Sequence, residues 1–319
     1  MTEQLEFLPQ GVIPACLMPF DSDLQLDIPA YRRHLRDLAS VEGISAITVN
    51  GHAAEIHALS FQEQQRTLEV AVNELARRVP IVTGIYADSS LEAARVARMS
   101  EEMGANALLV LPPNSTIMGG QLRPEMVHEH FSRITDSTEL PLILFQYPLV
   151  SLGHPLETLL ELCRTFPTIC AVKDWCNDPA LHEIHIRELH SLERPVRVLS
   201  THSSWLLSSL VLGCDGLLSG AGSVIANLQV ALWNAVRSGH LREAQAINDQ
   251  IYWTVRAFYR PPMLDMHNRM KEALVLLGRL ESAHVRPPLV KLTKEEIREI
   301  GQLLSRAGLD ERTVYGLTC

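Results

Sequence analysis

Short apolar segments recur along the first 220 residues at intervals of twenty to thirty-odd residues. Each segment is brief and rich in Val, Ile, Leu or Ala, the composition of strands that are buried on both faces of a parallel sheet. The pattern therefore predicts eight strands. They are Gly11–Met18, Gly43–Val49, Pro80–Tyr86, Ala107–Pro113, Pro141–Pro148, Thr168–Asp174, Val196–Thr201 and Gly213–Ser219.

Helical patterns fill the intervals between these segments. After Phe61, apolar residues follow one another at spacings of three to four, which places them on one face of a helix. A Ser or Thr followed three residues later by Glu predicts a capping box at a helix start. Three such pairs occur: Ser60 with Glu63, Ser89 with Glu92, and Thr293 with Glu296.

Eight strands in strict alternation with helices predict a (β/α)₈ TIM barrel. A helix that begins around Ala226 and ends near Arg237 would complete it. Residues 240–319 contain three helical patterns, about Leu241–Phe258, Met263–Leu280 and Lys294–Ala307, without a strand signal. We expect a barrel over residues 1–239 and a C-terminal three-helix extension over 240–319. The alternative is a doubly wound open sheet, but the first strand leads into PFDSD and not into a glycine-rich phosphate loop.

The composition and net charge of the chain argue against some classes of binding partner. The 319-residue chain is 46% hydrophobic, and 28 Lys and Arg against 37 Asp and Glu leave a net charge of −9 without a basic block. Nucleic acid is therefore not an expected partner. Neither a signal-peptide pattern nor an apolar window near the ~20 residues of a membrane span is present, so we expect a cytoplasmic protein that does not bind membranes. The cysteines, which we expect to be reduced thiols, are Cys16, Cys163, Cys170, Cys176, Cys214 and Cys319.

In a TIM barrel, the reactive groups lie where the strands end and the following loops begin. A short set of polar residues occupies these positions. They are Asn50, His52, Glu55, Tyr86, Asp88, Asn114, Ser115, Gln146, Tyr147, Lys173, Asp174, Thr201, His202, Ser219 and Ser223.

Lys173 is the most informative member of this set. The chain has four lysines against twenty-four arginines, and Lys173 lies inside the apolar segment ICAVKDW. Burial lowers the pKa of a lysine, and the neutral amine can form an imine with a carbonyl substrate. This is the chemistry of class I aldolases and dehydratases. The alternative is a structural lysine at the strand edge that pairs with Asp174 or Glu55.

Several motifs, in their order along the chain, resemble the dihydrodipicolinate synthase and N-acetylneuraminate lyase family. They are NGHAAE after the second strand, PIVTGIYADSSLEAARVARMSEEMGANALLVLPP across the third and fourth, PLILFQYP at the fifth, AVKDW at the sixth, and RPPLVKLT near the end. The resemblance covers nearly the whole chain. It implies a homotetrameric barrel enzyme in which Lys173 forms a Schiff base with a 2-oxo acid, commonly pyruvate.

The sequence departs from this family at positions that contact the substrate. Synthases carry two adjacent hydroxyl residues and a glycine before the glutamate after the second strand, where this chain has His52, Ala53 and Ala54. The family's tyrosines fall at Phe145 and Ser115. The arginine that holds the second substrate's carboxylate falls near Val150, although Arg123 could in principle reach the mouth of the barrel.

Other residues could replace these groups. Tyr147 lies two positions beyond Phe145, so on a strand it points to the same side, and we expect it to act as the proton-transferring phenol or simply to pack there. The backbone N–H groups of residues 52 and 53 could bind a carboxylate, with His52 as an added donor. His202 is a second candidate for proton transfer. We therefore expect Lys173 and Tyr147 as catalytic residues and His52, Ala53, Ser115, His202 and Ser219 as substrate-binding residues.

No metal site is expected. His182, His185 and His190 follow the sixth strand without HExxH spacing and without a carboxylate placed to close a zinc site, which favours a solvated helix face. Trp175 could line the pocket or cover the strand end.

Together these observations predict a lysine-dependent lyase, an aldolase or dehydratase, that acts on a 2-oxo acid of the pyruvate type or derived from a sugar. No cofactor is implied, and a homotetramer, a dimer of dimers, is the expected assembly. One alternative is a true 4-hydroxy-tetrahydrodipicolinate synthase, which condenses pyruvate with aspartate semialdehyde. Another is a barrel that binds an oxo acid without catalysis.

Overall fold

The computed structural model describes residues 7–75 and 78–309. Eight parallel strands form one sheet in the order β1-β8-β7-β6-β5-β4-β3-β2. Parallel bridges from Val12 to Ile44 and from Ala15 to Thr48 connect the two ends, so the sheet closes on itself. The strands are β1 (Gly11–Pro14), β2 (Ile47–Val49), β3 (Ile81–Ile85), β4 (Ala107–Val110), β5 (Leu142–Gln146), β6 (Ile169–Asp174), β7 (Arg197–Ser200) and β8 (Gly216–Ser219).

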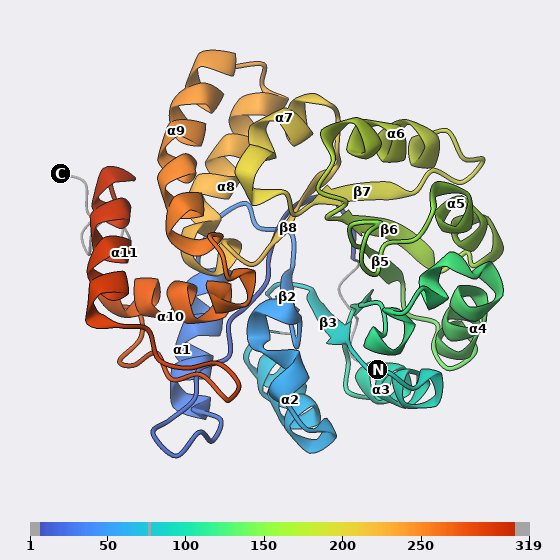
Figure 1. The fold of residues 1–319 in the computed structure, drawn as a ribbon, viewed down its shortest axis with the longest axis horizontal. Coiled ribbons are helices and arrows are strands. Elements are labelled where there is room, and N and C mark those ends of the chain that lie inside the picture. The colour runs from blue at the N-terminus through green and yellow to red at the C-terminus, as the bar shows by residue number, and fades with distance from the viewer. Residues whose placement is uncertain (1–6, 76–77, 310–319) are drawn as a thin grey trace.

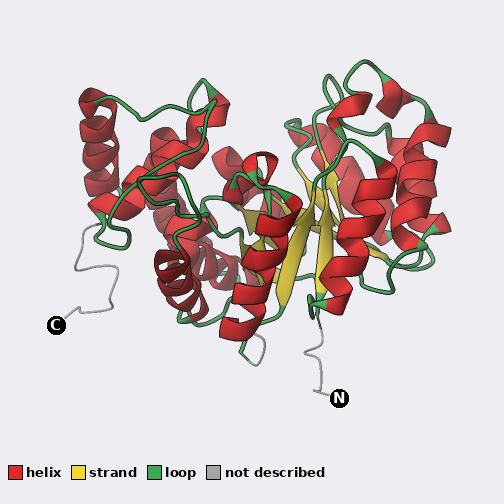
Figure 2. Ribbon diagram, turned by 90° about the horizontal axis from the view of Figure 1, so that it is seen from below, coloured by secondary structure: helices red, strands yellow, loops and turns green. Residues whose placement is uncertain are grey.

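The predicted barrel is confirmed, and its closure excludes the doubly wound alternative. Every predicted strand is present, within shorter bounds, and almost every strand residue is buried because the sheet is covered outside by helices and filled inside by side chains. Figure 1 shows the helices around the strands, and Figure 2 shows the barrel from the side.

The helices alternate with the strands. They are α1 (Ile28–Ala39), α2 (Phe61–Leu75), α3 (Ser90–Glu102), α4 (Pro124–Thr135), α5 (Leu156–Thr165), α6 (Pro179–His190), α7 (Leu206–Val211) and α8 (Gly222–Arg237). Helix α8 begins before the predicted Ala226, but non-helical backbone at Ile225 separates its first turn from the rest. Short 3-10 helices occupy the loops: η1 (His52–Ala54), η2 (Ile56–Ala58), η3 (Asn114–Thr116), η4 (Gly120–Leu122) and η5 (Ser203–Trp205).

Two of the three predicted capping boxes form. Ser60 and Glu63 exchange backbone-to-side-chain hydrogen bonds before α2, and Thr293 and Glu296 do so at the last helix. The box predicted from Ser89 and Glu92 is wrong. The side chain of Ser89 makes no capping hydrogen bond, and that of Glu92 accepts a hydrogen bond from Arg95 one turn along.

Three further helices follow the barrel: α9 (Leu241–Phe258), α10 (Met266–Leu276), preceded by η6 (Met263–Asp265), and α11 (Lys294–Arg306). Helix α9 packs on α8, and α11 packs on both α9 and α10. In Figure 1 these helices, coloured orange to red, lie together on one side of the barrel. The helical extension predicted from the sequence is therefore present, while the division at residues 239 and 240 stays a prediction.

The five cysteines in the described ranges are free thiols, and Cys319 lies outside them. Within those ranges, no helix combines the length and the apolar character that crossing a bilayer requires.

Candidate active site

A cavity opens at the carboxyl ends of the strands, where a TIM barrel carries its reactive groups. About 740 Å³ of space lies between its walls, the open mouth included. Its walls come from the ends of six strands, β1, β2, β5, β6, β7 and β8, and from the C-terminal extension. The lining residues are Ala15, His52, Ala53, Phe145, Tyr147, Lys173, Trp175, Asn177, Thr201, His202, Ser203, Ser204, Trp205, Gly220, Tyr259, Met263, Met266 and Met270.

Lys173 supplies a buried amine to this cavity. Its side chain on β6 is 4% exposed, and burial lowers its pKa from 10.5 to about 7. Phe145 is its register partner on β5, which places the lysine Nζ 3.9 Å from the centre of the phenyl ring. A large fraction of this amine is therefore neutral at physiological pH.

The alternative in which Lys173 pairs with Asp174 or Glu55 is wrong. Both carboxylates are engaged elsewhere: Glu55 forms an ion pair with Lys271, and Asp174 accepts hydrogen bonds from two histidines. Lys173 forms no ion pair within the described ranges. Its amine is thus held in an apolar site without a counter-charge, the arrangement that favours a nucleophilic lysine.

The loop after β2 places His52 and Ala53 in the cavity. Asn50 has a left-handed backbone and donates from its side chain to the carbonyl of Gln64. A Cβ atom at Gly84 would lie 1.9 Å from the Asn50 carbonyl oxygen, so the loop fits only against glycine. Residues 52 and 53 begin the η1 turn, whose first N–H groups have no acceptor within the turn. Burial, aided by the Lys173 charge, lowers the pKa of His52 to about 3, so its imidazole is neutral.

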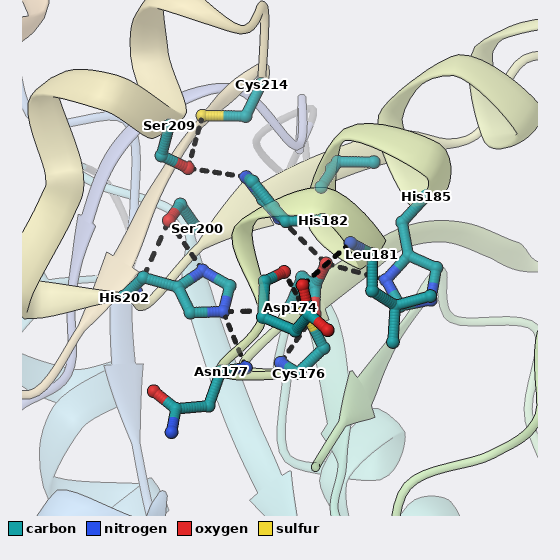
Figure 3. Close-up of polar contacts among 12 residues, drawn as sticks. Asp174, Cys176, Asn177, Leu181, His182, His185, Ser200, His202, Ser209 and Cys214 are labelled. Atoms are coloured by element: carbon teal, nitrogen blue, oxygen red, sulfur yellow. Dashed lines mark hydrogen bonds and ion pairs between the residues drawn. The ribbon is translucent and has the colours of Figure 1, made fainter. Parts of the chain in front are cut away.

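Asp174, beside the lysine, is the centre of a buried polar network (Figure 3). One carboxylate oxygen accepts hydrogen bonds from Nδ1 of His182 and Nδ1 of His185, both at 2.8 Å, and the other accepts from the backbone N–H of Cys176. Burial alone would raise the pKa of Asp174, but the hydrogen bonds from His182 and His185 hold it well below its usual range. Asp174 therefore stays ionised and joins β6 to α6.

This network corrects the expectation of a solvated histidine face. His182 and His185 are fully buried, and Asp174 is the carboxylate that the sequence reasoning did not place beside them. Only His190 is partly exposed, and it pairs with Asp215. The prediction of a solvated face was wrong because residues 182 and 185 are one turn apart on α6, and both therefore face the strand that this helix covers.

The same cluster has a donor set that zinc can accept. One ligand atom each from Asp174, Cys176, His182 and His202 lies within 4.8 Å of the others. In the structure these atoms are occupied by hydrogen bonds: Asp174 accepts from His182, and Nε2 of His202 accepts from the N–H of Asn177 at 3.1 Å. The arrangement is a hydrogen-bonded support beneath the cavity.

His202 lines the cavity with an uncharged imidazole ring. Its two ring nitrogens are hydrogen-bonded to Ser200 and to the N–H of Asn177, and its ring stacks on Trp205 at 3.9 Å. Burial lowers its pKa to about 3, although the charge of Asp174 acts in the opposite direction. Proton transfer through this imidazole would have to break one of its two hydrogen bonds.

Tyr259, at the end of α9, is a site residue that the sequence reasoning missed. Its hydroxyl accepts the N–H of Ala221 at 2.9 Å and is hydrogen-bonded by Ser203 and Ser219. The same hydroxyl is 3.4 Å from the position that a Cβ on Gly220 would take, and Ala53 is 3.5 Å from that position. No strand end marks Tyr259 in the sequence, so no pattern could have indicated it.

The remaining predicted residues fall into two groups. Tyr147 and Trp175 line the cavity with their rings 5.3 Å apart, and Ser219 contacts it through Ser203 and Tyr259. Ser115, by contrast, is exposed and hydrogen-bonded to Asp88, outside the cavity lining. Its side chain is therefore not placed to bind a substrate there.

Neither position considered for a carboxylate-binding arginine supplies one. Val150 is 97% exposed. Arg123 is an exposed residue that pairs with Glu125 and does not line the cavity. Lys173 is the single lysine or arginine among the lining residues.

Known proteins resemble this chain over nearly its whole length. The chain is 29% identical over 303 residues to a 4-hydroxy-tetrahydrodipicolinate synthase of Chlorobium limicola, covering 94% of this chain and 97% of that protein. It is 26% identical to YagE of Escherichia coli K12, which is provisionally described as a 2-dehydro-3-deoxy-D-gluconate aldolase, over 94% of this chain and 97% of YagE.

The solved structure of YagE in complex with pyruvate matches with a TM-score of 0.86 at 25% identity, over 95% of this chain and 99% of that one. The dihydrodipicolinate synthetase family matches residues 8–307, which include the barrel, the cavity and the three C-terminal helices. The chain therefore belongs to the dihydrodipicolinate synthetase family and is an enzyme of the lyase type found in that family.

Proposed function

We propose that this protein is a Schiff-base lyase in which Lys173 forms an imine with a 2-oxo acid. The observation that carries the proposal is the buried amine of Lys173, which has no ion-pair partner in the described chain and a pKa of about 7. Attack of the neutral amine on the keto carbon, followed by loss of water, gives an iminium ion that accepts an electron pair from a neighbouring C–C or C–H bond.

The cavity offers groups for the other requirements of this chemistry. The N–H groups of His52 and Ala53, at the start of η1, are suited to hold the oxo-acid carboxylate. Two phenols, Tyr147 and Tyr259, are available for proton transfer, and Ser219 would relay through Tyr259. Burial raises the pKa of both phenols, so each would act as a proton donor that is neutral at rest.

Aldol cleavage or dehydration is favoured over the synthase reaction. The relatives named above include a synthase. The synthase reaction requires a cationic side chain that binds the carboxylate of the second substrate, aspartate semialdehyde. Neither position 150, which is a valine, nor Arg123, which lies outside the cavity lining, supplies that side chain. Turnover of a 4-hydroxy-2-oxo acid would separate the lyase from a barrel that only binds an oxo acid.

We also propose a cytoplasmic homotetramer. A group of exposed apolar side chains supports self-association, since such patches are uncommon on monomers. These residues belong to the segment from η3 to the first turn of α4 and to the loop after β5, and a hydrogen bond from Gln121 to the carbonyl of Ser151 joins the two segments. They are Ile117, Met118, Leu122, Met126, Leu149 and Val150. Sedimentation equilibrium would test the assembly.

Reductive trapping tests the mechanism. Incubation with pyruvate and borohydride should add one pyruvate-derived group per chain on the peptide that contains Lys173, because an imine is reduced to a stable amine. Lys173→Arg should abolish trapping and turnover while the fold is kept, since arginine is never a neutral nucleophile at neutral pH. A label on Lys271, Lys291 or Lys294 would contradict the assignment.

A further inference from the structure

The hydrogen-bonded support beneath the cavity contains four side chains of the types that bind zinc. They are Asp174, Cys176, His182 and His202, and one ligand atom from each lies within 4.8 Å of the others. All four residues are buried. In the described ranges this is the one such group of three or more histidine, cysteine or acidic residues. A carboxylate, a thiolate and two imidazoles are donors that can fill the four positions of a closed zinc site.

Neighbouring elements of the barrel bring these side chains together (Figure 3). Asp174 ends β6, His182 lies near the start of α6, and His202 follows β7. Between β6 and α6, Asn177 has a left-handed backbone that turns the chain directly after Cys176. The Sγ atom of Cys176 lies 3.7 Å from Nε2 of His202. Zinc bonds of about 2.3 Å to sulfur and about 2.0 Å to nitrogen give a tetrahedral edge of about 3.6 Å, so this pair is already spaced for an ion.

The hydrogen bonds around His182 leave no neutral form of its ring that suits both neighbours. The Cys214 thiol donates to the carbonyl of Gly216, so the hydrogen of the Ser209 hydroxyl is donated to the Cys214 sulfur. The Ser209 oxygen therefore accepts from Nε2 of His182 at 2.6 Å. Nδ1 of the same ring lies 2.8 Å from the Asp174 carboxylate. A neutral imidazole has a single N–H, so a second proton or a metal ion is needed to join Nδ1 to the carboxylate.

His202 directs its unprotonated nitrogen to the same centre. Its Nε2 accepts the N–H of Asn177 at 3.1 Å, so Nδ1 carries the proton and donates to the Ser200 hydroxyl at 3.3 Å. Asn177 is exposed, and its N–H can therefore bind water when an ion takes Nε2. Each of the two histidines thus turns one nitrogen to the cluster and holds a serine with the other, as metal-binding histidines do.

The charge of the cluster also suits a divalent ion. The carboxylate of Asp174 is fully buried and has no lysine or arginine partner in the described ranges. His185 donates to one of its oxygens and the N–H of Cys176 donates to the other, which fixes its orientation. A zinc ion with one carboxylate, one thiolate and two neutral imidazoles carries no net charge. Such a site avoids the cost of burying an uncompensated ion.

We propose that Asp174, Cys176, His182 and His202 bind a structural zinc ion that ties β6 to α6 and β7. On binding, the Cys176 thiol proton and the Nδ1 proton of His182 pass to solvent, and zinc takes their places. The distance between His182 and Asp174 then opens by about half an ångström, to a tetrahedral edge of about 3.3 Å. Thiolate and imidazole select zinc over Mg²⁺, which prefers oxygen ligands. The ion would fix the ring of His202, which lines the cavity.

Zinc loading of the unmodified protein tests the site without any variant. The full-length protein is treated with a chelator, given one equivalent of zinc chloride and passed through gel filtration. We expect one zinc ion per chain and a Kd of about 50 nM or lower, the range of structural zinc sites. X-ray absorption should show one sulfur at about 2.3 Å and three nitrogen or oxygen ligands at about 2.0–2.2 Å. Loss of zinc on the column, or a spectrum without sulfur, would overturn the proposal.

Cys176→Ser and Cys163→Ser form a matched pair. Cys163 is also a buried free thiol, but it lies on α5 and outside the cluster. The parent and Cys163→Ser, loaded with Co²⁺, should show a sulfur-to-cobalt charge-transfer band that Cys176→Ser lacks. Cys176→Ser should also bind zinc at least about 100-fold more weakly, since loss of an outer partner alone costs about 10–100-fold. A Cys176→Ser protein that keeps the band would overturn the assignment.

Ser209→Ala tests the role of His182. It removes the acceptor of the His182 Nε2 proton and should weaken zinc binding by about 10–100-fold. Ser100→Ala is the control, because Ser100 is equally buried and donates to the carbonyl of Val96 within α3. It should leave the zinc affinity unchanged. Equal zinc affinity in the two variants would overturn His182 as a ligand.

Discussion

Lys271 of α10 and Glu55 of the loop after β2 form an ion pair that is fully buried at both ends. Lys271 also donates to the carbonyl of His284 at 2.8 Å, and the second carboxylate oxygen of Glu55 accepts the N–H of Arg286. These contacts from the C-terminal extension therefore fix the position of the loop that carries His52 and Ala53. The pair joins two residues that lie 216 positions apart in the chain.

Breaking this pair should mainly affect stability. Glu55→Gln leaves the buried Lys271 without its counter-charge, so the free energy of unfolding should fall by about 3–5 kcal/mol. Glu55→Gln combined with Lys271→Met should recover most of the loss, because no charge is then buried. Urea denaturation of the three proteins measures both effects. A Glu55→Gln protein as stable as the parent would show that the pair is not needed.

Imine formation should follow the protonation of Lys173. Its pKa is about 7, so the neutral fraction rises as the pH is raised through neutrality. The initial rate of borohydride trapping at low pyruvate concentration should rise about tenfold between pH 6 and pH 8.5 and then level off. A rate that continues to climb toward pH 10 would indicate an ordinary, unperturbed lysine.

The same burial should make Lys173 a source of instability. The folded pKa of Lys173 lies below the ordinary lysine value of 10.5, so between about pH 7 and pH 10.5 the unfolded chain binds more protons and stability rises with pH. Lys173→Met should therefore be more stable than the parent at pH 7, by on the order of 1–4 kcal/mol. The difference should shrink as the pH approaches 10. Thermal or urea unfolding across this range measures it, and a destabilised Lys173→Met would oppose the interpretation.

Tyr147→Phe and Tyr259→Phe form a matched pair for the proton-transfer step. Each removes one hydroxyl from the cavity and keeps the ring. The variant that removes the general acid or base should lower kcat by ~10²–10⁴-fold, while pyruvate trapping persists. The other variant should retain kcat within a few fold. If both retain it, proton transfer does not use a phenol, and both tyrosines have packing roles only.

This protein should be a poor 4-hydroxy-tetrahydrodipicolinate synthase. The second substrate's carboxylate would lack a charge-assisted hydrogen bond, which costs about 2–5 kcal/mol, or about 1.5 to 3.7 orders of magnitude in efficiency. A coupled assay of pyruvate with aspartate semialdehyde checks this. An efficiency near 10⁴ M⁻¹s⁻¹ or above, in the ordinary enzyme range, would contradict it.

Local chemistry in the sequence determined the barrel. Strands such as Pro141–Pro148 and Thr168–Asp174 are recognisable because a strand buried on both faces must be apolar throughout, and that requirement is local. The same rule identified Lys173, since an isolated lysine in such a segment is conspicuous without any knowledge of its neighbours.

Tertiary structure alone decided which partners the polar residues acquire. The expected solvated face of His182 and His185 became a buried network because Asp174 of β6 lies beneath α6. Tyr259 reached the cavity, and Lys271 reached Glu55, because the C-terminal helices fold back over the barrel. Such contacts join residues far apart in the chain, and their energies depend on burial and geometry that no local pattern encodes.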